Sequence, residues 1–374
     1  MQKKIKIVHI TSSLKMGGAE AVLCDLIKKL DPSVFEHHVI FFHDGVHSSC
    51  LRDLNISIYQ VKGVVSLYDP FFCYRLYKLV KKIAPDCIHS LLWSANVFAR
   101  LIGKALNIVT ISAMHNNIDQ DGKLRNILDS ITINFAQVLI AVSPQVKQSI
   151  LDKNKWLPAT KIEVIENGID LNQLRALNQA HRVAPSQLGL TENHFVIGSV
   201  GRFVPVKNYG LLLESFALLY VDYQHARLVL VGLGPLETQL KEDAQRLGIA
   251  YAVIFVVGQP SYKYYHLFDC FALASDKEGI SIALLEAMSF GIACVITNSS
   301  ADHAVIIHGV NGLIVQAGNA QQLAQGFEYC IDNRQIAQQM GHNAQQIVME
   351  KFASDGMVAR YELLFKKVSQ KNFQ

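Results

Sequence analysis

Two carboxylates, Glu278 and Glu286, lie in the otherwise apolar segment EGISIALLEAMSFG. The preceding run CFALAS (270–275) has the composition of a buried strand, so Glu278 falls near the carboxyl end of that strand. The residues around Glu286 are apolar, and a carboxylate in such surroundings needs a charged or hydrogen-bonding partner. This pairing of carboxylates with a buried segment marks the stretch as a candidate site.

A helix is expected directly after Glu278, over about residues 281–290. Ser281 is suited to the N-cap and Gly291 to the C′ position, where a left-handed backbone ends helices. The first turn of a helix leaves backbone N–H groups without a partner, here at 280–283, and its dipole favours an anion there. We therefore predict one carboxylate on a loop and one on a helix whose beginning can bind an anion.

Two cations follow another predicted strand, in GRFVPVKN (201–208). Arg202 can donate two parallel hydrogen bonds to neighbouring oxygens, and Lys207 acts as a point charge. Together they are placed to bind a diphosphate at a strand end. Two solvated surface cations are the alternative if the motif is taken by itself.

A glycine-rich turn, SSLKMGGAEAV (12–22), lies between the first predicted strand and the first predicted helix. Gly17 and Gly18 allow the backbone to approach a ligand closely, and the helix N-terminus is suited to phosphate. The segment is not GxGxxG and lacks the Lys-Ser/Thr ending of a P-loop. An ordinary tight turn is the alternative.

Several other patterns are weaker. VGLGP (231–235) lacks the third glycine of a nicotinamide site, and DQD (119–121) lies in a polar segment typical of a turn, so no metal site is predicted. His115 follows the apolar run VTISAM, and His89 lies inside the run CIHSLLW. A single histidine at such a position usually has a structural role.

Short apolar runs alternate with helical stretches along the whole chain. Continuous apolar strands of this kind are typical of parallel sheets covered by helices on both faces, and two such series predict two doubly wound domains. Ligands of open α/β sheets bind beyond the carboxyl ends of the strands. The predicted strands are 5–10, 37–42, 87–92, 109–114, 138–143, 161–168, 195–201, 226–232, 251–258, 270–275 and 292–297.

The composition indicates a globular protein: 374 residues, half of them apolar, are enough for two ordinary domains. We see neither a signal sequence nor an apolar run long enough to span a bilayer. Seven scattered cysteines without a CxxC pair suggest neither a disulfide framework nor a zinc site. A reducing, cytoplasmic location is expected.

The net charge of +4 is unevenly distributed. Residues 1–180 carry 21 Lys and Arg against 15 Asp and Glu, whereas residues 181–374 carry 14 against 16, so the halves are +6 and −2. YRLYKLVKKI (74–83) contributes to the excess and has the pattern of an amphipathic helix with a cationic face. Such a helix is either a solvated surface or a contact with an anionic membrane or a phosphorylated acceptor.

Taken together, the motifs resemble the retaining GT-B glycosyltransferases of family 4, also called glycosyltransferase group 1. The resemblance rests on GGAE after the first strand, GRFVPVKN and the two glutamates of EGISIALLEAMSFG, in this order and spacing. Lesser matches run along nearly the whole chain: AVSPQVKQSI (141–150), VIENGID (164–170), VGLGPLE (231–237), FDCFALASDKEG (268–279) and HGVNGLIV (308–315).

The resemblance implies two Rossmann-like domains that face each other across a cleft. The expected bounds are 1–175 for an acceptor-binding domain and 176–355 for a nucleotide-sugar-binding domain, with the helix at 356–374 returning to the first. A change to polar composition at 171–194 agrees with a seam in this region.

The resemblance also implies roles for individual residues. Glu278 would face the donor sugar, Glu286 would bind the nucleotide ribose, and His115 would lie near hydroxyls of the transferred sugar. Arg202 and Lys207 would neutralise the donor diphosphate. The implied catalytic residues are Glu278, His115, Arg202 and Lys207, and the implied donor-binding residues are Gly17, Gly18, Arg202, Lys207, Pro260, Glu278, Gly279, Ile280, Ser281, Ile282 and Glu286.

The implied activity is transfer of a hexose, with retention, from a UDP- or GDP-sugar to a saccharide or lipid-linked acceptor, in cell-surface polysaccharide or glycolipid biosynthesis. Neither a cofactor nor a metal is expected, and no nucleic-acid partner. The enzyme would work in the cytoplasm, with a peripheral contact to the inner face of the cytoplasmic membrane. The alternatives are a catalytically inactive sugar-nucleotide-binding or scaffold protein and, less suited to the GxG segment, an NAD-linked oxidoreductase.

Overall fold

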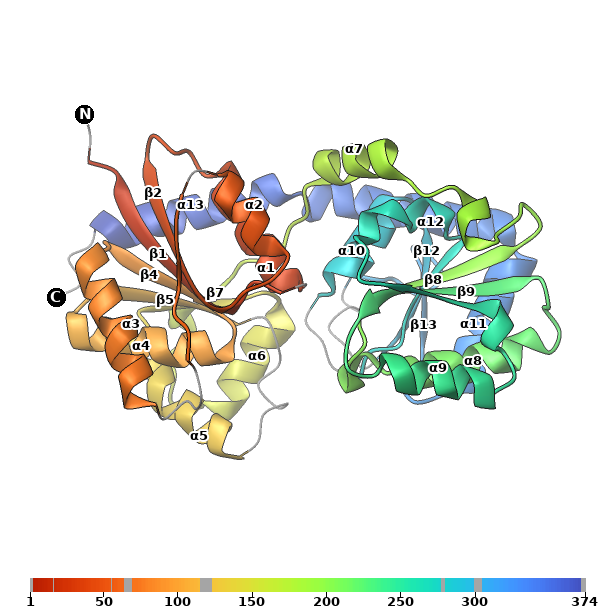
Figure 1. Ribbon diagram of the computed structural model, residues 1–374, viewed down its shortest axis with the longest axis horizontal. Coiled ribbons are helices and arrows are strands. Elements are labelled where there is room, and N and C mark those ends of the chain that lie inside the picture. The colour runs from red at the N-terminus through yellow and green to blue at the C-terminus, as the bar shows by residue number, and fades with distance from the viewer. Residues whose placement is uncertain are drawn as a thin grey trace. The chain divides into compact units, whose positions relative to one another are not determined.

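The computed structural model describes residues 3–15, 17–54, 56–63, 69–114, 123–276, 280–298 and 305–370. The chain divides into two units, one of Met1–Gly168 with Ser354–Gln374 and one of Ile169–Ala353. Each unit is built on a parallel sheet with helices on both faces (Figure 1). The predicted fold class of two Rossmann-like α/β domains is confirmed.

The first unit contains a sheet of order β3-β2-β1-β4-β5-β6-β7 among the described residues. Helices α1, α2 and α13 lie on one face, and α3 and α4 on the other (Figure 1). Its strands are β1 (Ile5–Ser13), β2 (Phe35–His43), β3 (Ser57–Gln60), β4 (Cys87–Leu91), β5 (Val109–Met114), β6 (Val138–Ala141) and β7 (Ile162–Val164); its helices are α1 (Gly18–Lys29), α2 (His47–Asp53), α3 (Pro70–Ile83), α4 (Trp93–Leu106), α5 (Lys123–Thr132), α6 (Pro144–Lys153) and α13 (Ser354–Gln370).

The second unit contains a sheet of order β10-β9-β8-β11-β12-β13. Helices α8, α9 and α11 cover one face and α7, α10 and α12 the other, each over its own apolar core (Figure 1). The strands are β8 (Phe195–Arg202), β9 (Ala226–Leu233), β10 (Val253–Val257), β11 (Cys270–Leu273), β12 (Ala293–Thr297) and β13 (Leu313–Val315); the helices are α7 (Leu171–His181), α8 (Tyr209–Tyr220), α9 (Glu237–Arg246), α10 (Ile282–Ser289), α11 (Ala320–Asp332) and α12 (Arg334–Lys351).

Both strand orders contain a switch point where the chain reverses its direction of progress across the sheet. In the first unit this point lies between β1 and β4, and in the second between β8 and β11. Loops that leave two such strands at their carboxyl ends diverge to opposite faces and leave room for a ligand. The turn with Gly17 follows β1, the turn with Lys207 follows β8, and the segment containing Glu278 follows β11.

The polar segment 171–194 begins with α7, which belongs to the second unit. The Asn178 side chain donates a hydrogen bond to the carbonyl of Tyr262 at 2.6 Å, and Leu174 is buried in the core of that unit. The first unit accordingly ends at Gly168, earlier than the expected boundary at 175. The composition of the segment indicated a seam, but not that its first helix packs on the unit that follows.

A chain of buried histidines joins three strands of the first unit. His9 on β1 lies 3.0 Å from His37 on β2 through its Nε2 and 3.0 Å from His89 on β4 through its Nδ1. Phe365 of α13 meets the His9 and His89 rings edge-on. His89 is thus part of the packing between the sheet and α13, the structural role that single histidines usually have.

We expect this histidine chain to make the first unit sensitive to mild acid. Burial, with His37 and His89 as further causes, lowers the pKa of His9 well below 6.5, and burial lowers that of His37 to about 4. The unfolded chain therefore binds protons first, and each of these histidines lowers the free energy of unfolding by about 1.4 kcal/mol per pH unit below 6.5, until its folded pKa is reached. Urea unfolding between pH 7.5 and 5 measures this slope.

Two variants separate this effect from general acid lability. His9→Gln removes a titrating group and is expected to flatten the slope, whereas His181→Gln, at an exposed position on α7, is expected to leave it unchanged. Equal slopes for His9→Gln and the unaltered protein would rule the histidine chain out as the cause.

Candidate active site

The turn after β8 carries the two predicted phosphate-binding cations. Arg202 is the last residue of β8 and is exposed, and Lys207 is half-buried at the end of the 3₁₀ turn η5 (Pro205–Lys207). Asn208 follows in the left-handed region with φ of 48° and caps α8, because its side chain accepts a hydrogen bond from the Leu211 amide at 3.3 Å. The turn therefore ends in a fixed conformation at the start of a helix.

Glycines on β8, on β9 and directly after β9 allow this turn to pack closely. A Cβ on Gly201 would lie 3.1 Å from both Lys207 Cε and the Tyr209 hydroxyl, and one on Gly232 would overlap the Gly201 carbonyl. A Cβ on Gly234 would overlap the backbone of Phe203. The GxG of VGLGP is thus explained by close packing against the strand end that carries Arg202.

Two hydrogen bonds join the Lys207 turn to the segment that follows β11. The Asn208 side chain donates to Asp276 Oδ1 at 2.8 Å, and the Asp276 amide donates to the Val206 carbonyl at 2.9 Å. Lys277, Glu278 and Gly279 lie outside the described residues. Because Asp276 precedes them in the chain, these bonds fix where the segment with Glu278 begins relative to the turn with Lys207.

Helix α10 begins as predicted. Ser281 is its N-cap residue, and the first hydrogen bond within the helix runs from the Leu285 amide to the Ser281 carbonyl at 3.1 Å. The amides of the residues between them have no acceptor within the helix and lie at its positive end. Gly291, with φ of 73°, follows the C-cap Phe290 and confirms the predicted helix end. Ile280, which precedes the helix, is buried.

Glu286 is held by two side chains that were not predicted. Its Oε2 accepts a hydrogen bond from the Tyr265 hydroxyl at 2.6 Å and one from Ser261 Oγ at 3.3 Å. Burial, together with the Glu286 charge, raises the pKa of Tyr265 well above 10, so the phenol remains protonated and donates. Pro260 precedes Ser261 and is the N-cap of the 3₁₀ turn η7 (Ser261–Lys263). These two hydroxyls are the hydrogen-bonding partners that a half-buried carboxylate in apolar surroundings requires.

Gly17 and Gly18 lie at the start of α1, with Gly17 as N-cap in an extended conformation. A Cβ on Gly17 would overlap the carboxylate end of the buried Glu20 side chain, so a larger residue here would displace that carboxylate. On the other side of the turn, the Leu14 amide donates to the His43 carbonyl at 2.9 Å, and the His47 amide donates to the Leu14 carbonyl at 3.0 Å. The turn is thus packed against the loop after β2.

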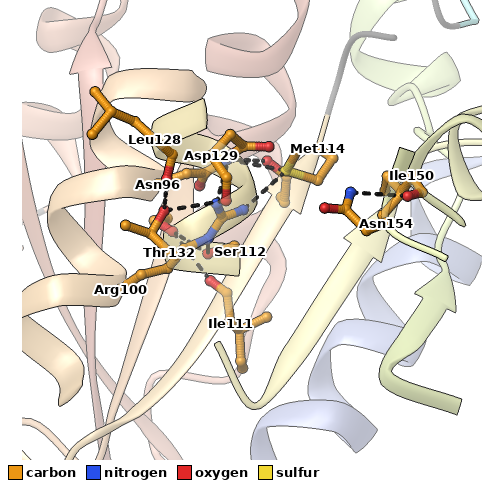
Figure 2. Close-up of polar contacts among 12 residues, drawn as sticks. Asn96, Arg100, Ile111, Ser112, Met114, Leu128, Asp129, Thr132, Ile150 and Asn154 are labelled. Atoms are coloured by element: carbon orange, nitrogen blue, oxygen red, sulfur yellow. Dashed lines mark hydrogen bonds and ion pairs between the residues drawn. The ribbon is translucent and has the colours of Figure 1, made fainter. Parts of the chain in front are cut away.

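His115 and the DQD segment (119–121) lie outside the described residues. The strand that leads to His115, β5, ends at Met114. Side chains of α4 and α5 surround this strand end, with Arg100 at the centre (Figure 2). None of these residues was predicted.

Among the residues that the structure describes, no group of three or more His, Cys, Asp or Glu could hold a metal ion. None of the helices that the structure describes is both long and apolar enough to cross a membrane.

Sequence comparison gives one family model for each unit. Residues 182–347 match glycosyl transferases group 1, and residues 16–173 match glycosyltransferase family 4. Among curated proteins, the UDP-Gal:alpha-D-GlcNAc-diphosphoundecaprenol alpha-1,3-galactosyltransferase of Escherichia coli is 22% identical, with 93% of each chain covered. A Campylobacter jejuni N-acetylgalactosaminyltransferase, whose name specifies a diphospho-undecaprenol acceptor, is 26% identical over 87% of this chain and 89% of its own.

Comparison with solved structures finds the same fold in a protein of known structure. The Anabaena protein Alr3699/HepE, solved in complex with UDP and glucose, superposes with a TM-score of 0.85 at 22% identity, covering 97% of this chain and all of that one. A group 1 model thus matches residues 182–347, a family 4 model matches residues 16–173, and each unit is Rossmann-like; together these findings identify the chain as a glycosyltransferase of the GT-B fold.

Proposed function

We propose that this protein transfers a hexose from a UDP- or GDP-sugar to a saccharide or lipid-linked acceptor, with retention of anomeric configuration and without a metal. The observation that carries the proposal is the switch point between β8 and β11. There, hydrogen bonds from Asn208 and the Asp276 amide join the Lys207 turn to the segment that leads to Glu278. The turn with Lys207 is thereby fixed to Asp276, from which the chain continues to Glu278 and then to the N-terminus of α10.

The chemistry of transfer needs this combination of charges. Cleavage of the bond between a sugar and a nucleoside diphosphate develops negative charge on the phosphate and positive character on the sugar ring. Preorganised groups stabilise such charges without reorganising during the step, so Arg202 and Lys207 would bind the leaving phosphate and Glu278 would face the sugar. The departing phosphate would take the proton of the acceptor hydroxyl on the same face, which gives retention.

The relatives support the class of donor and acceptor. The names of the Escherichia coli and Campylobacter jejuni proteins specify diphosphoundecaprenol acceptors, and the former specifies UDP-galactose. The complex of the Anabaena protein contains UDP and glucose. We extend this chemistry to the present chain and place its activity in cell-surface polysaccharide or glycolipid biosynthesis.

A thermal-unfolding screen of UDP- and GDP-sugars tests the proposal. A donor that binds the folded protein raises its stability by mass action, by about 2.7 kcal/mol at a concentration 100 times its Kd. Radiolabelled transfer to a diphosphoprenol-linked sugar then measures turnover. Stabilisation without transfer or donor hydrolysis would favour an inactive binding protein, and absence of stabilisation by every sugar nucleotide would contradict the proposal.

We also propose that α3 contacts an anionic membrane from the cytoplasmic side. Phe72, Leu76 and Val80 are buried, whereas Phe71 and Tyr74 are exposed to 77% and 54%, and the outer face carries Arg75, Lys78, Lys81 and Lys82. Exposed aromatic rings beside cations are suited to a lipid interface. The finding fits the predicted amphipathic helix with a cationic face.

Sedimentation with vesicles containing phosphatidylglycerol tests this contact at low salt. Each lysine near an anionic surface contributes about 1 kcal/mol, so Lys78→Gln with Lys82→Gln is expected to weaken binding about 30-fold. Lys241→Gln, on α9 in the second unit, is the matched control and is expected to bind like the unaltered protein. Failure of the unaltered protein to sediment with these vesicles, where screening is weak, would refute the contact.

A further inference from the structure

Helices α1 and α2 pack against each other in the first unit, and each carries a cysteine at the contact (Figure 1). Cys24 of α1 is buried, and Cys50 of α2 is half-buried. A side-chain hydrogen bond joins the two thiols. All seven cysteines of the chain are free, so two reduced thiols face each other here.

Backbone contacts fix the start of α2 beside α1. The His47 amide, at the first residue of α2, donates to the Leu14 carbonyl at 3.0 Å, and a Cβ on Gly45 would overlap that carbonyl. Cys24 Sγ in turn lies 3.9 Å from the His47 carbonyl. Residues three apart on a helix share a face, and their side chains lean toward its N-terminus, so Cys50 points to the place that Cys24 reaches. The packing of the two helices thus brings the thiols together.

The surroundings of Cys50 favour its ionised form. The hydrogen bond from Cys24 is the main cause that lowers the pKa of Cys50 to about 7, and the charge of Lys28 on α1 adds to it. Burial and the carboxylates of Asp25 and Asp53 act in the opposite direction. For Cys24, the hydrogen bond to Cys50 and burial both raise the pKa. One thiol of the pair is therefore ionised near neutral pH, and the other keeps its proton.

A role in packing does not account for this pair. Buried cysteines often serve as small apolar side chains, and the pair of Cys270 and Cys330 in the second unit fits that role, because both are completely buried. Cys50 differs in being partly open to solvent. Reversible oxidation is typical of an accessible thiol with a low pKa that stands next to a second cysteine.

We propose that Cys50 is the peroxide-reactive thiol of a reversible redox site, that Cys24 is its resolving partner, and that oxidation joins α1 to α2 by a disulfide. In the first step the Cys50 thiolate attacks hydrogen peroxide. A sulfur–oxygen bond forms and the oxygen–oxygen bond breaks, so the sulfur is oxidised to a sulfenic acid, and the departing hydroxide takes a proton from solvent to become water.

In the second step the Cys24 sulfur attacks the Cys50 sulfur. The disulfide bond forms, the sulfur–oxygen bond breaks, and the hydroxyl leaves with the Cys24 proton as water. Two thiols and one peroxide thus give one disulfide and two waters. The sulfenic acid carries no negative charge, so the main cause that raises the pKa of Cys24 is absent when Cys24 has to react.

Peroxide treatment of the full chain tests the site. After free thiols are blocked, peptide mapping by mass spectrometry is expected to find a disulfide between Cys24 and Cys50 that dithiothreitol reverses. Iodoacetamide at pH 7 is expected to label Cys50 at least about 3-fold faster than Cys73 of α3, which is also half-buried but whose pKa burial and Asp69 raise. The factor follows because about half of Cys50 is ionised, against about 3% of an ordinary thiol, while a thiolate of lower pKa is a weaker nucleophile.

Three variants assign the roles. Cys24→Ser keeps a hydroxyl that can donate to Cys50, so Cys50 is expected to react as before but to stop at the sulfenic acid, which dimedone traps, and to reach the sulfinic acid at higher peroxide. Cys50→Ser, at the half-buried position, is expected to leave Cys24 reduced. Cys73→Ser is the matched control and is expected to form the disulfide like the unaltered protein.

Several results would overturn the proposal. These are a Cys24 and Cys50 pair that stays reduced in peroxide sufficient to oxidise free cysteine, a disulfide that forms only after unfolding in urea, and equal labelling of Cys50 and Cys73. If Cys24→Ser fails to fold, the unaltered protein and Cys50→Ser still decide the question. None of these measurements involves sugar transfer, so the redox site and the proposed function can fail separately.

Discussion

Replacing Lys207 with alanine is expected to lower kcat for sugar transfer about 10²- to 10³-fold, the usual effect of removing one preorganised group from a site where charge develops. Lys207 ends a turn that is fixed by the Asn208 cap and by the bonds to Asp276, so its charge is in place before the donor binds. Glu278→Ala removes the other assigned charge and is expected to abolish transfer altogether. Single-turnover measurement with saturating donor separates the chemical step from binding.

Lys207→Arg and Lys263→Ala serve as controls for this prediction. The first keeps a cation at the turn and is expected to retain part of the activity. The second removes Lys263, a residue of η7 to which no role is assigned, and is expected to retain all of the activity. Full turnover by Lys207→Ala would show that the donor phosphates do not depend on this turn.

Glu286→Ala is expected to weaken binding of the donor about 10- to 100-fold, because a hydrogen bond to a charged group contributes about 1.5–3 kcal/mol. It also removes the nearer acceptor of the buried Tyr265 hydroxyl and leaves the Ala283 carbonyl at 3.5 Å, so the protein is expected to lose about 1–3 kcal/mol of stability. Calorimetric titration with UDP and urea unfolding measure the two effects independently.

Glu286→Gln distinguishes the role of Glu286 in donor binding from its role in holding Tyr265. The amide oxygen can still accept the Tyr265 hydroxyl, so stability is expected to stay near that of the unaltered protein, whereas the loss of charge weakens the donor complex. Tyr265→Phe is the reciprocal variant and leaves the carboxylate with one fewer donor. Unchanged affinity for UDP in Glu286→Ala would mean that the carboxylate has only the structural role of holding Tyr265.

Most of the architecture could be predicted from apolar periodicity. Each of the eleven predicted strands is present, and the helix after Glu278 has the predicted cap and ending at Gly291. The strands that were missed, β3 and β13, are short edge strands, and β3 has exposed residues at both ends. An edge strand is covered on fewer sides, so it lacks the continuous apolar run that marks a central strand.

The residues that hold the assigned charged residues in place were less predictable than the charged residues themselves. Asn208 and Asp276 stand 68 positions apart, and only the pairing of β8 with β11 brings their loops together. Tyr265 belongs to the aromatic segment SYKYYHLF, in which no spacing marks one ring as the partner of Glu286. Local pattern identifies elements and their ends, whereas these contacts depend on strand order across the sheet.

The first unit consists of two separate segments of the chain, and this affects the order in which the two units can fold. Its last helix, α13, is encoded after all of residues 169–353, yet Phe365 from this helix packs against His9 and Phe35. At a synthesis rate of about 5–20 residues per second, the face of the sheet that carries these rings waits about 10–40 seconds for its cover. The second unit emerges and can fold within that interval. The first domain to be started is therefore the last to be completed.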